Sequence, residues 1–121
     1  MQRRNTSAAE VSTLKIDRDC FVDKDWIENY VRTILTICSM FRVTVESIKM
    51  CRSKRKGNHF YISINPPVEA NVANQLQWLL GDDDLRVDRN RARIQAGFDR
   101  WNKLFERLDA RLRTIYRPVT S

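Results

Sequence analysis

Hydrophobic and polar residues alternate with a period of two in several parts of the chain, a pattern that is typical of half-buried strands. The predicted strands cover residues 11–21, 42–53 and 59–64. In the second of these, the apolar parity shifts between Val45 and Ile48, which predicts a β-bulge or an irregular start. A turn that ends at Gly57 separates the second and third strands, so residues 43–64 are expected to form a β-hairpin.

Three other segments show the spacing of amphipathic helices, with apolar residues at every third or fourth position. The first begins at Trp26 and ends at Phe41, after acidic residues that favour a helix N-terminus. The second, residues 68–80, follows two prolines that are predicted to end the hairpin, and it precedes Gly81, a helix stop signal. A run of aspartates then caps a third, arginine-rich helix over residues 84–96.

The order of these elements predicts an α+β fold of the ferredoxin-like or RRM-like type, βαββαβ, with an antiparallel sheet and helices on one face. The other face of the sheet is left open for a ligand. Residues 98–116 form an extra C-terminal segment, and the sequence leaves open whether it is a helix or a strand. Residues 1–10 are predicted to be a flexible basic tail, and residues 11–121 a single domain.

The composition is that of one globular domain, with 121 residues of which 42% are hydrophobic and 31% charged. There is no apolar run of about 18 residues and no apolar stretch after the basic N-terminus, so we expect neither a membrane span nor a secretory signal. The expected location is therefore intracellular. The three cysteines lack the spacing of a zinc site and are expected to be small buried thiols in a reducing compartment.

The balance of charges favours polyanionic partners. Lysine and arginine number 22 against 15 acidic residues, which gives a net charge of +7. A basic surface attracts DNA, RNA or nucleotides. The alternative is a protein that is basic for solubility alone.

Alternation along the first strand predicts a group of polar side chains on the open face. If the apolar residues of this strand face the helices, then Lys15, Asp17 and Asp19 face away from them. The two carboxylates would lie about 7 Å apart, close enough to share divalent ions. His59 and Tyr61 of the hairpin are expected on the same face. The simpler alternatives are a turn-forming aspartate pair, a surface histidine and a tyrosine that only packs.

Basic residues are predicted to surround this face. The tip of the hairpin carries Arg52, Lys54, Arg55 and Lys56. A stripe on the third helix contains Arg86, Arg89 and Arg93. Both groups are candidates for contacts with phosphates, and Tyr61 is a candidate for stacking on a base. The alternative is that both groups are solvated surface, with the arginines paired to neighbouring aspartates.

Three segments resemble the sequence motifs of the RRM-like palm core of archaeo-eukaryotic-type primases and primase-polymerases. Leu14-Lys15-Ile16-Asp17-Arg18-Asp19 is similar to a strand that ends in hydrophobic-Asp-hydrophobic-Asp. Ser53-Lys54-Arg55-Lys56-Gly57-Asn58-His59 is similar to a loose form of a Ser-x-His strand, and Leu85-Arg86-Val87-Asp88 to a later hydrophobic-Asp motif. Residues 80–86 also resemble a segment of small RRM-like proteins of archaea and of their viruses and plasmids. The resemblance covers residues 11–108.

The resemblance implies that Asp17 and Asp19 hold Mg²⁺ or Mn²⁺. It also implies that Asp88 is a third catalytic carboxylate, that His59 contacts a nucleotide phosphate, and that part of Trp101–Leu108 is a strand. The implied function is binding of nucleic acid or nucleotides in DNA replication, with metal-dependent nucleotidyl transfer as the implied activity. Full primases are far longer than this chain, so the residues leave open whether it is an enzyme.

Two other functions stay open from the residues alone. One is a catalytically silent DNA- or RNA-binding accessory module, in which the aspartates are turn residues and the affinity comes from lysine and arginine. The other is an interaction domain that forms a homodimer, or binds a replication protein, through an apolar C-terminal segment. That segment contains Phe98, Trp101, Phe105 and Leu108.

Overall fold

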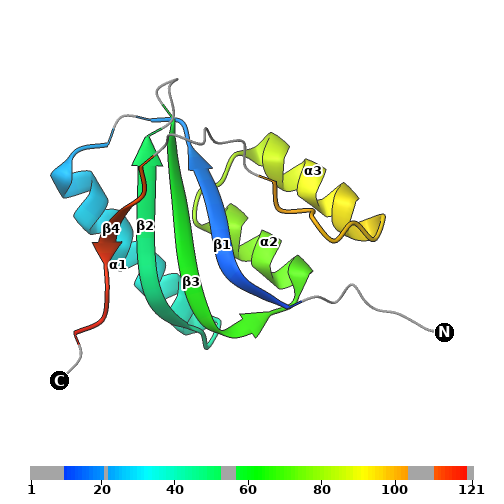
Figure 1. Ribbon diagram of the computed structural model, residues 1–121, viewed down its shortest axis with the longest axis horizontal. Coiled ribbons are helices and arrows are strands. Elements are labelled where there is room, and N and C mark those ends of the chain that lie inside the picture. Colours follow the sequence, from blue (N-terminus) through cyan, green and yellow to red (C-terminus); the bar gives the residue numbers. More distant parts are fainter. Residues whose placement is uncertain (1–9, 21, 53–56, 104–110, 120–121) are drawn as a thin grey trace.

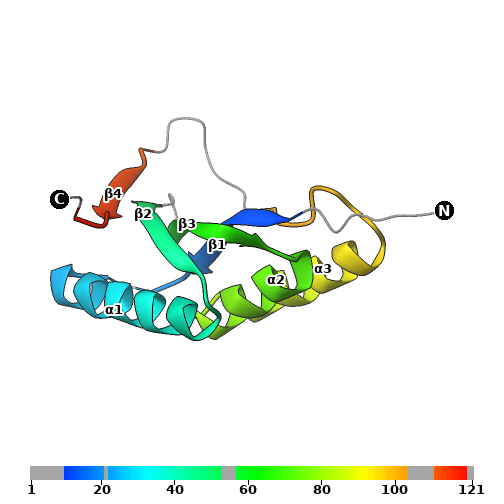
Figure 2. The same ribbon diagram turned by 90° about the horizontal axis from the view of Figure 1, so that it is seen from below.

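The computed structural model describes residues 10–20, 22–52, 57–103 and 111–119. Within these ranges the chain forms one sheet of four antiparallel strands and three helices (Figure 1). In chain order the elements are β1 (Val11–Arg18), α1 (Lys24–Met40), β2 (Thr44–Arg52), β3 (Asn58–Val68), α2 (Ala70–Leu79), α3 (Asp84–Gln95) and β4 (Arg113–Tyr116). The helices all lie on one side of the sheet (Figure 2). The predicted α+β fold, with an antiparallel sheet that has helices on one face, is confirmed.

The order of the strands differs from that of a ferredoxin-like sheet, in which the last strand lies beside the first. Here the order is β1-β3-β2-β4. The last strand pairs with β2 at the opposite edge of the sheet, so β1 is itself an edge strand. The ferredoxin-like arrangement that the sequence predicts is therefore not confirmed. The side chains that occupy the outer edge of β1 supply the physical reason and are described with the site.

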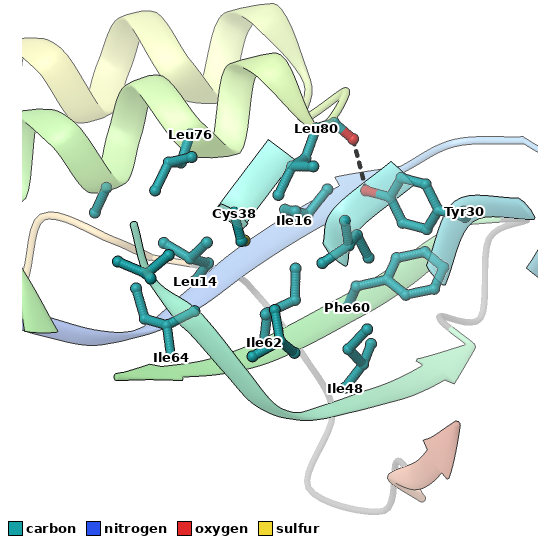
Figure 3. Packing of buried hydrophobic residues seen from close by; sticks show 14 of the residues in the cluster. Leu14, Ile16, Tyr30, Cys38, Ile48, Phe60, Ile62, Ile64, Leu76 and Leu80 are labelled. Atoms are coloured by element: carbon teal, nitrogen blue, oxygen red, sulfur yellow. Dashed lines mark hydrogen bonds between the residues drawn. The ribbon is translucent and has the colours of Figure 1, made fainter. Parts of the chain in front are cut away.

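The hydrophobic core lies between the sheet and the helices (Figure 3). Alternate residues of the strands build its sheet side, and Leu14, Ile16 and Phe60 are fully buried there. Burial of each such side chain stabilises the fold by about 1.5–3 kcal/mol. The ring of Tyr30 packs edge-on against Phe60, with centroids 4.9 Å apart. Its hydroxyl donates a hydrogen bond of 2.6 Å to the carbonyl of Leu80, which ties α1 to the end of α2.

The helices begin and end at the predicted signals. The Asp23 carboxylate accepts a hydrogen bond from the backbone N–H of Trp26 at 2.8 Å and caps α1. Asp83 caps α3 by accepting from the N–H of Leu85 at 2.8 Å. Caps of this kind contribute about 1 kcal/mol each. Gly81, at φ +91°, lets the chain turn between α2 and α3. In the part of the chain that the structure describes, no helix is long and apolar enough to cross a membrane.

The hairpin is longer than predicted. The register shift between Val45 and Ser47 confirms the predicted irregularity in β2. Pro66 and Pro67, however, do not end β3, which extends to Val68. The pairing of β2 ends before these prolines, and the register with β1 is irregular opposite them. Their missing N–H groups therefore interrupt no regular ladder there.

Of the two alternatives that the sequence leaves open for the C-terminal segment, the described residues contain a short strand and no helix. Phe98 to Lys103 have no regular secondary structure, and Trp101 is 4% exposed and belongs to the core. The guanidinium of Arg93 on α3 donates a hydrogen bond to the backbone carbonyl of Trp101. In a helix, that carbonyl would accept from a backbone N–H instead. The last strand lies at Arg113–Tyr116, beyond the stretch 101–108 that the primase resemblance implies. Phe105, Leu108 and residues 1–9 of the predicted tail lie outside the described residues.

Candidate nucleic-acid interface

The open face of the sheet carries an aromatic side chain between two cations. Tyr61 on the central strand β3 pairs with Lys15 on β1 and with Lys49 on β2. Cross-strand partners have Cβ atoms about 4.5–5.5 Å apart and point to the same face. All three residues are partly exposed. We call Lys15, Tyr61 and Lys49 the cation–aromatic row.

Lys49 was not among the residues selected from the sequence. The bulge in β2 reverses the alternation between Val45 and Ile48, so the face of Lys49 is ambiguous in the sequence. The register runs unbroken from Arg52 opposite Asn58 to Ser47 opposite Ser63, so counting from the turn of the hairpin gives the observed partner. Thr114 of β4 lies opposite Lys49 and extends the same row to the far edge of the sheet.

A row of hydroxyl side chains lies next to the cation–aromatic row. Ser63 on β3 pairs with Thr13 on β1 and with Ser47 on β2, and all three residues are partly exposed. Their hydroxyl groups can donate to phosphate oxygens. We call Thr13, Ser63 and Ser47 the hydroxyl row.

On the other side of the cation–aromatic row, Asp17 pairs with His59, which in turn pairs with Cys51. The Nε2 atom of His59 lies 3.7 Å from the Oδ1 atom of Asp17. The histidine side chain is only 6% exposed and that of Asp17 is 33% exposed. Among the described residues, Nδ1 of His59 has no hydrogen-bond partner. The sequence expectation that Asp17, His59 and Tyr61 share one face matches this placement.

The position of Asp17 changes its acidity. Partial burial raises the pKa of its carboxyl group above the ordinary value, because the charged form loses hydration. The neighbouring His59 acts in the opposite direction, and the charges of Asp83 and Asp19 raise the pKa further. The Asp17 carboxylate is therefore less well hydrated than a carboxylate that is fully exposed to solvent.

Side chains from α2 and α3 occupy the outer edge of β1. The backbone N–H of Lys15 donates to the amide oxygen of Gln77 at 2.9 Å, and the N–H of Asp17 donates to Asp82 at 2.9 Å. The guanidinium of Arg86 donates to the carbonyl of Lys15. These groups would otherwise bind another strand. We call Gln77, Asp82 and Arg86 the β1 edge network.

The β1 edge network corrects the interpretation of the acidic run and of the arginine stripe. Asp82 is fully buried at its side chain, and its Oδ1 atom lies 3.2 Å from Nε of Arg86. Burial raises the pKa of Asp82, while the Arg86 charge lowers it. The Arg86 guanidinium also donates to Asn102 at 2.9 Å and to the carbonyl of Lys103, and the side chain is 10% exposed. Since internal contacts occupy Arg86, we do not include it in the interface.

The remaining predicted site residues are one residue near Asp17 and several residues in the helix layer. Asp19 follows the end of β1 and is exposed, and its charge acts on Asp17. Asp88 and Arg89 are exposed on α3, in the helix layer, and Asp88 forms an ion pair of 3.0 Å with Arg91. Asp88 is thus on the side of the sheet opposite to Asp17. Arg93 donates to Asn90 at 3.2 Å and to Trp101, so its role within the described chain is structural.

The predicted hairpin tip lies largely outside the described residues. This applies to Lys54, Arg55 and Lys56, whereas Arg52 is exposed at the end of β2. Arg52 pairs with Asn58, one step beyond Cys51 and His59. By the alternation of β2 it shares the face of Ile48 and Met50, so it lies on the side of the sheet opposite to Asp17.

The sequence predicts that Asp17 and Asp19 hold Mg²⁺ or Mn²⁺. Within residues 10–20, 22–52, 57–103 and 111–119, no group of three or more His, Cys, Asp or Glu side chains could hold a metal ion. We derive no catalytic step through a metal ion. The sequence matches no protein-family model, no curated protein and no solved structure.

Proposed function

We propose that the protein binds single-stranded nucleic acid on the open face of its sheet. The observation that carries this proposal is the cation–aromatic row, in which Tyr61 lies between Lys15 and Lys49 on neighbouring strands. Stacking of one base on an aromatic ring is worth about 1–3 kcal/mol. The two ammonium groups are within reach of the phosphates on either side of that base.

Single strands fit this face better than duplexes. In a duplex the bases stack on one another, so their flat faces cannot reach a tyrosine on a sheet. In a single strand they are free to do so, and the ring of Tyr61 accepts any base. The net charge of +7 adds a long-range attraction for the polyanion.

The first test removes the two cations. We expect the double variant Lys15→Gln/Lys49→Gln to bind labelled single-stranded DNA and RNA more weakly than the unchanged protein. The slope of log K against log salt should fall by about 1.4, because two phosphate contacts are lost. Fluorescence anisotropy over a salt series measures both quantities.

A matched control removes the same number of positive charges from the helix layer instead of from the open face. Lys24 and Arg32 are exposed on α1, in the helix layer. The variant Lys24→Gln/Arg32→Gln should retain the salt slope of the unchanged protein. Equal slopes for the two double variants would show that binding depends on net charge alone and would contradict the proposed interface.

The second test removes the aromatic ring. Tyr61→Leu keeps an apolar side chain of similar size and should weaken binding about tenfold, within the range for one stacked base. Trp78 is 53% exposed on α2 and serves as the matched control, since Trp78→Leu removes an exposed aromatic from the helix layer. If Tyr61→Leu binds as tightly as Trp78→Leu, then no base stacks on Tyr61.

Metal-dependent nucleotidyl transfer, which the primase resemblance implies, is a second candidate function. The observation that favours it is the contact between Asp17 and His59, with Asp19 two residues further along. Under this candidate, Mn²⁺ should strengthen binding of single-stranded DNA, and Asp17→Asn/Asp19→Asn should abolish that effect. Binding that does not respond to Mn²⁺ in either protein would leave a binding module without this activity.

A further inference from the structure

We propose that Asp17 makes the open face selective for guanine among the bases that stack on Tyr61. This inference rests on the proposed nucleic-acid binding and adds the identity of the preferred base. It starts from the chemistry of a carboxylate, which has two oxygen acceptors side by side and no donor. Guanine has two adjacent donors, N1–H and the N2 amino group, on its Watson–Crick edge. The other standard bases present a donor next to an acceptor there.

The register of the sheet places Asp17 at the edge of a base stacked on Tyr61. Asp17 lies opposite His59, two residues along β1 from Lys15, which is the partner of Tyr61. Asp17 is thus a diagonal neighbour of Tyr61 on the same face, at about 7–8 Å. A purine that covers the tyrosine ring extends past it by several atoms, so its edge falls within hydrogen-bond reach of the carboxylate.

The backbone that carries the carboxylate is held before any ligand arrives. Its backbone N–H is bound by Asp82 of the β1 edge network, and its Oδ1 atom lies 3.7 Å from His59. Its side chain remains 33% exposed, so a ligand can reach it. Because the backbone is already held, only the side-chain torsions of Asp17 lose entropy on binding, which favours discrimination between bases.

The charges on either side of the cation–aromatic row give the base one orientation. The hydroxyl row and the two lysines attract phosphate, whereas the Asp17 carboxylate repels it. The sugar–phosphate backbone is therefore directed toward Thr13, Ser63 and Ser47. The Watson–Crick edge of the stacked base then points toward Asp17.

The test compares oligothymidylates that carry one guanine, adenine, cytosine or hypoxanthine at a central position. The unchanged protein should bind the guanine oligonucleotide about tenfold more tightly than the adenine or cytosine ones. Hypoxanthine keeps N1–H and lacks the N2 amino group, so its affinity should lie between these values. Asp17→Asn should abolish the preference for guanine, because the amide presents one donor and one acceptor, and should bind oligothymidylate at least as tightly as before.

The control variant is Asp25→Asn, which removes an exposed carboxylate in the first turn of α1. It should keep the guanine preference. Equal affinity of the unchanged protein for all four oligonucleotides would overturn the guanine inference and leave the proposed function intact. Absence of binding to every oligonucleotide would overturn the proposed function, and the guanine inference with it.

Discussion

At the scale of single residues, Gly81 joins the two helices that cover β1. Its φ of +91° is one that side-chain-bearing residues rarely adopt, and a Cβ atom there would lie 1.6 Å from Nη1 of Arg18. That guanidinium donates to the Gly81 carbonyl at 3.4 Å and lies over the rings of Trp26 and Tyr30, at 5.3 and 5.5 Å from their centroids. The glycine thus leaves room for a cation–π contact between β1 and α1.

Alanine substitutions at the two positive-φ glycines should separate backbone strain from this contact. Gly97 has φ +82°, and a Cβ atom there would meet nothing within 4 Å. We expect Gly97→Ala to lower the free energy of unfolding by about 1–2 kcal/mol through strain alone. Gly81→Ala should cost about 1 kcal/mol more, because Arg18 must also leave its ring partners. Urea unfolding measures both, and equal losses would show that Arg18 moves aside without cost.

The thiol of Cys38 should make the fold sensitive to alkali. Cys38 belongs to the same core cluster as Leu76 and Leu80 (Figure 3) and is 0% exposed. Burial raises the pKa of this thiol to about 11. In the unfolded chain the thiol loses its proton near its ordinary pKa of 9.0. Between pH 9.0 and about 11 the unfolded state therefore binds fewer protons than the folded state, and the free energy of unfolding falls as pH rises.

The expected loss between pH 9 and 11 is about 2–3 kcal/mol. It is measured as the free energy of unfolding at several pH values. Burial also raises the pKa of Tyr30, which adds a slope of the same sign at higher pH. Cys38→Ala should flatten the curve between pH 9 and 11. An unchanged curve in that variant would mean that Cys38 does not titrate across the transition.

At the scale of the elements, the β1 edge network decides where the sheet ends. Its hydrogen bonds join residues that are 62, 65 and 71 positions apart in the chain. They satisfy the outward N–H groups of Lys15 and Asp17 and one carbonyl, which would otherwise accept another strand. The edge next to β1 is therefore closed by side chains, and β4 pairs at the other edge.

Breaking this network should be far more damaging than removing an exposed arginine from the same helix. Arg86→Met leaves the buried Asp82 carboxylate without its cation and the Lys15 carbonyl without its donor. We expect a loss of about 3–5 kcal/mol in the free energy of unfolding. Arg89→Met, at an exposed position of α3, should change it by less than about 0.5 kcal/mol.

Amide hydrogen exchange gives a second measurement of the same effect. The amides of Lys15 and Asp17 should be protected in the unchanged protein, although no strand lies beyond β1 in the described chain. In Arg86→Met these two amides should lose more protection than those of β3. Fast exchange of both amides in the unchanged protein would contradict the β1 edge network.

At the scale of the whole molecule, β4 is an addition to a core that the other elements build. The buried core residues come from the rest of the chain, and Ile115 and Tyr116 of β4 only pack against it. Removal of residues 111–121 should therefore leave a chain that still unfolds cooperatively in urea. The open edge of β2 should then cause association that increases with concentration, as sedimentation would show.

Removal of residues 117–121, beyond β4, is the matched control and should leave the protein as it was. A truncated chain that shows no cooperative transition would mean that β4 is required for folding. A folded truncation that stays monomeric at high concentration would mean that the β2 edge is not prone to pairing.

The local structure could be read from the sequence because it depends on neighbours in the chain. Alternation on β1 correctly assigned its apolar residues Leu14 and Ile16 to the core. Alternation along the strands assigned Asp17 and Tyr61 to the opposite face, and the proposed site rests on them. Caps, helices and the bulge also follow from residues that lie within about a turn of one another.

The tertiary structure alone decided which polar side chains are buried and where the last strand pairs. Asp82 and Arg86 have the sequence pattern of a solvated, amphipathic helix start, and only long-range packing buries them against β1. A polar side chain has the same local pattern whether water or a distant backbone group satisfies it. For the same reason β4 was expected beside β1, whereas Lys49 was missed because the bulge in β2 makes its face ambiguous in the sequence. The sequence by itself determined which elements form and which faces they bury, since period and propensity are local. The partner of each edge depends on hydrogen bonds between segments far apart in the chain, and those exist only once the molecule is folded.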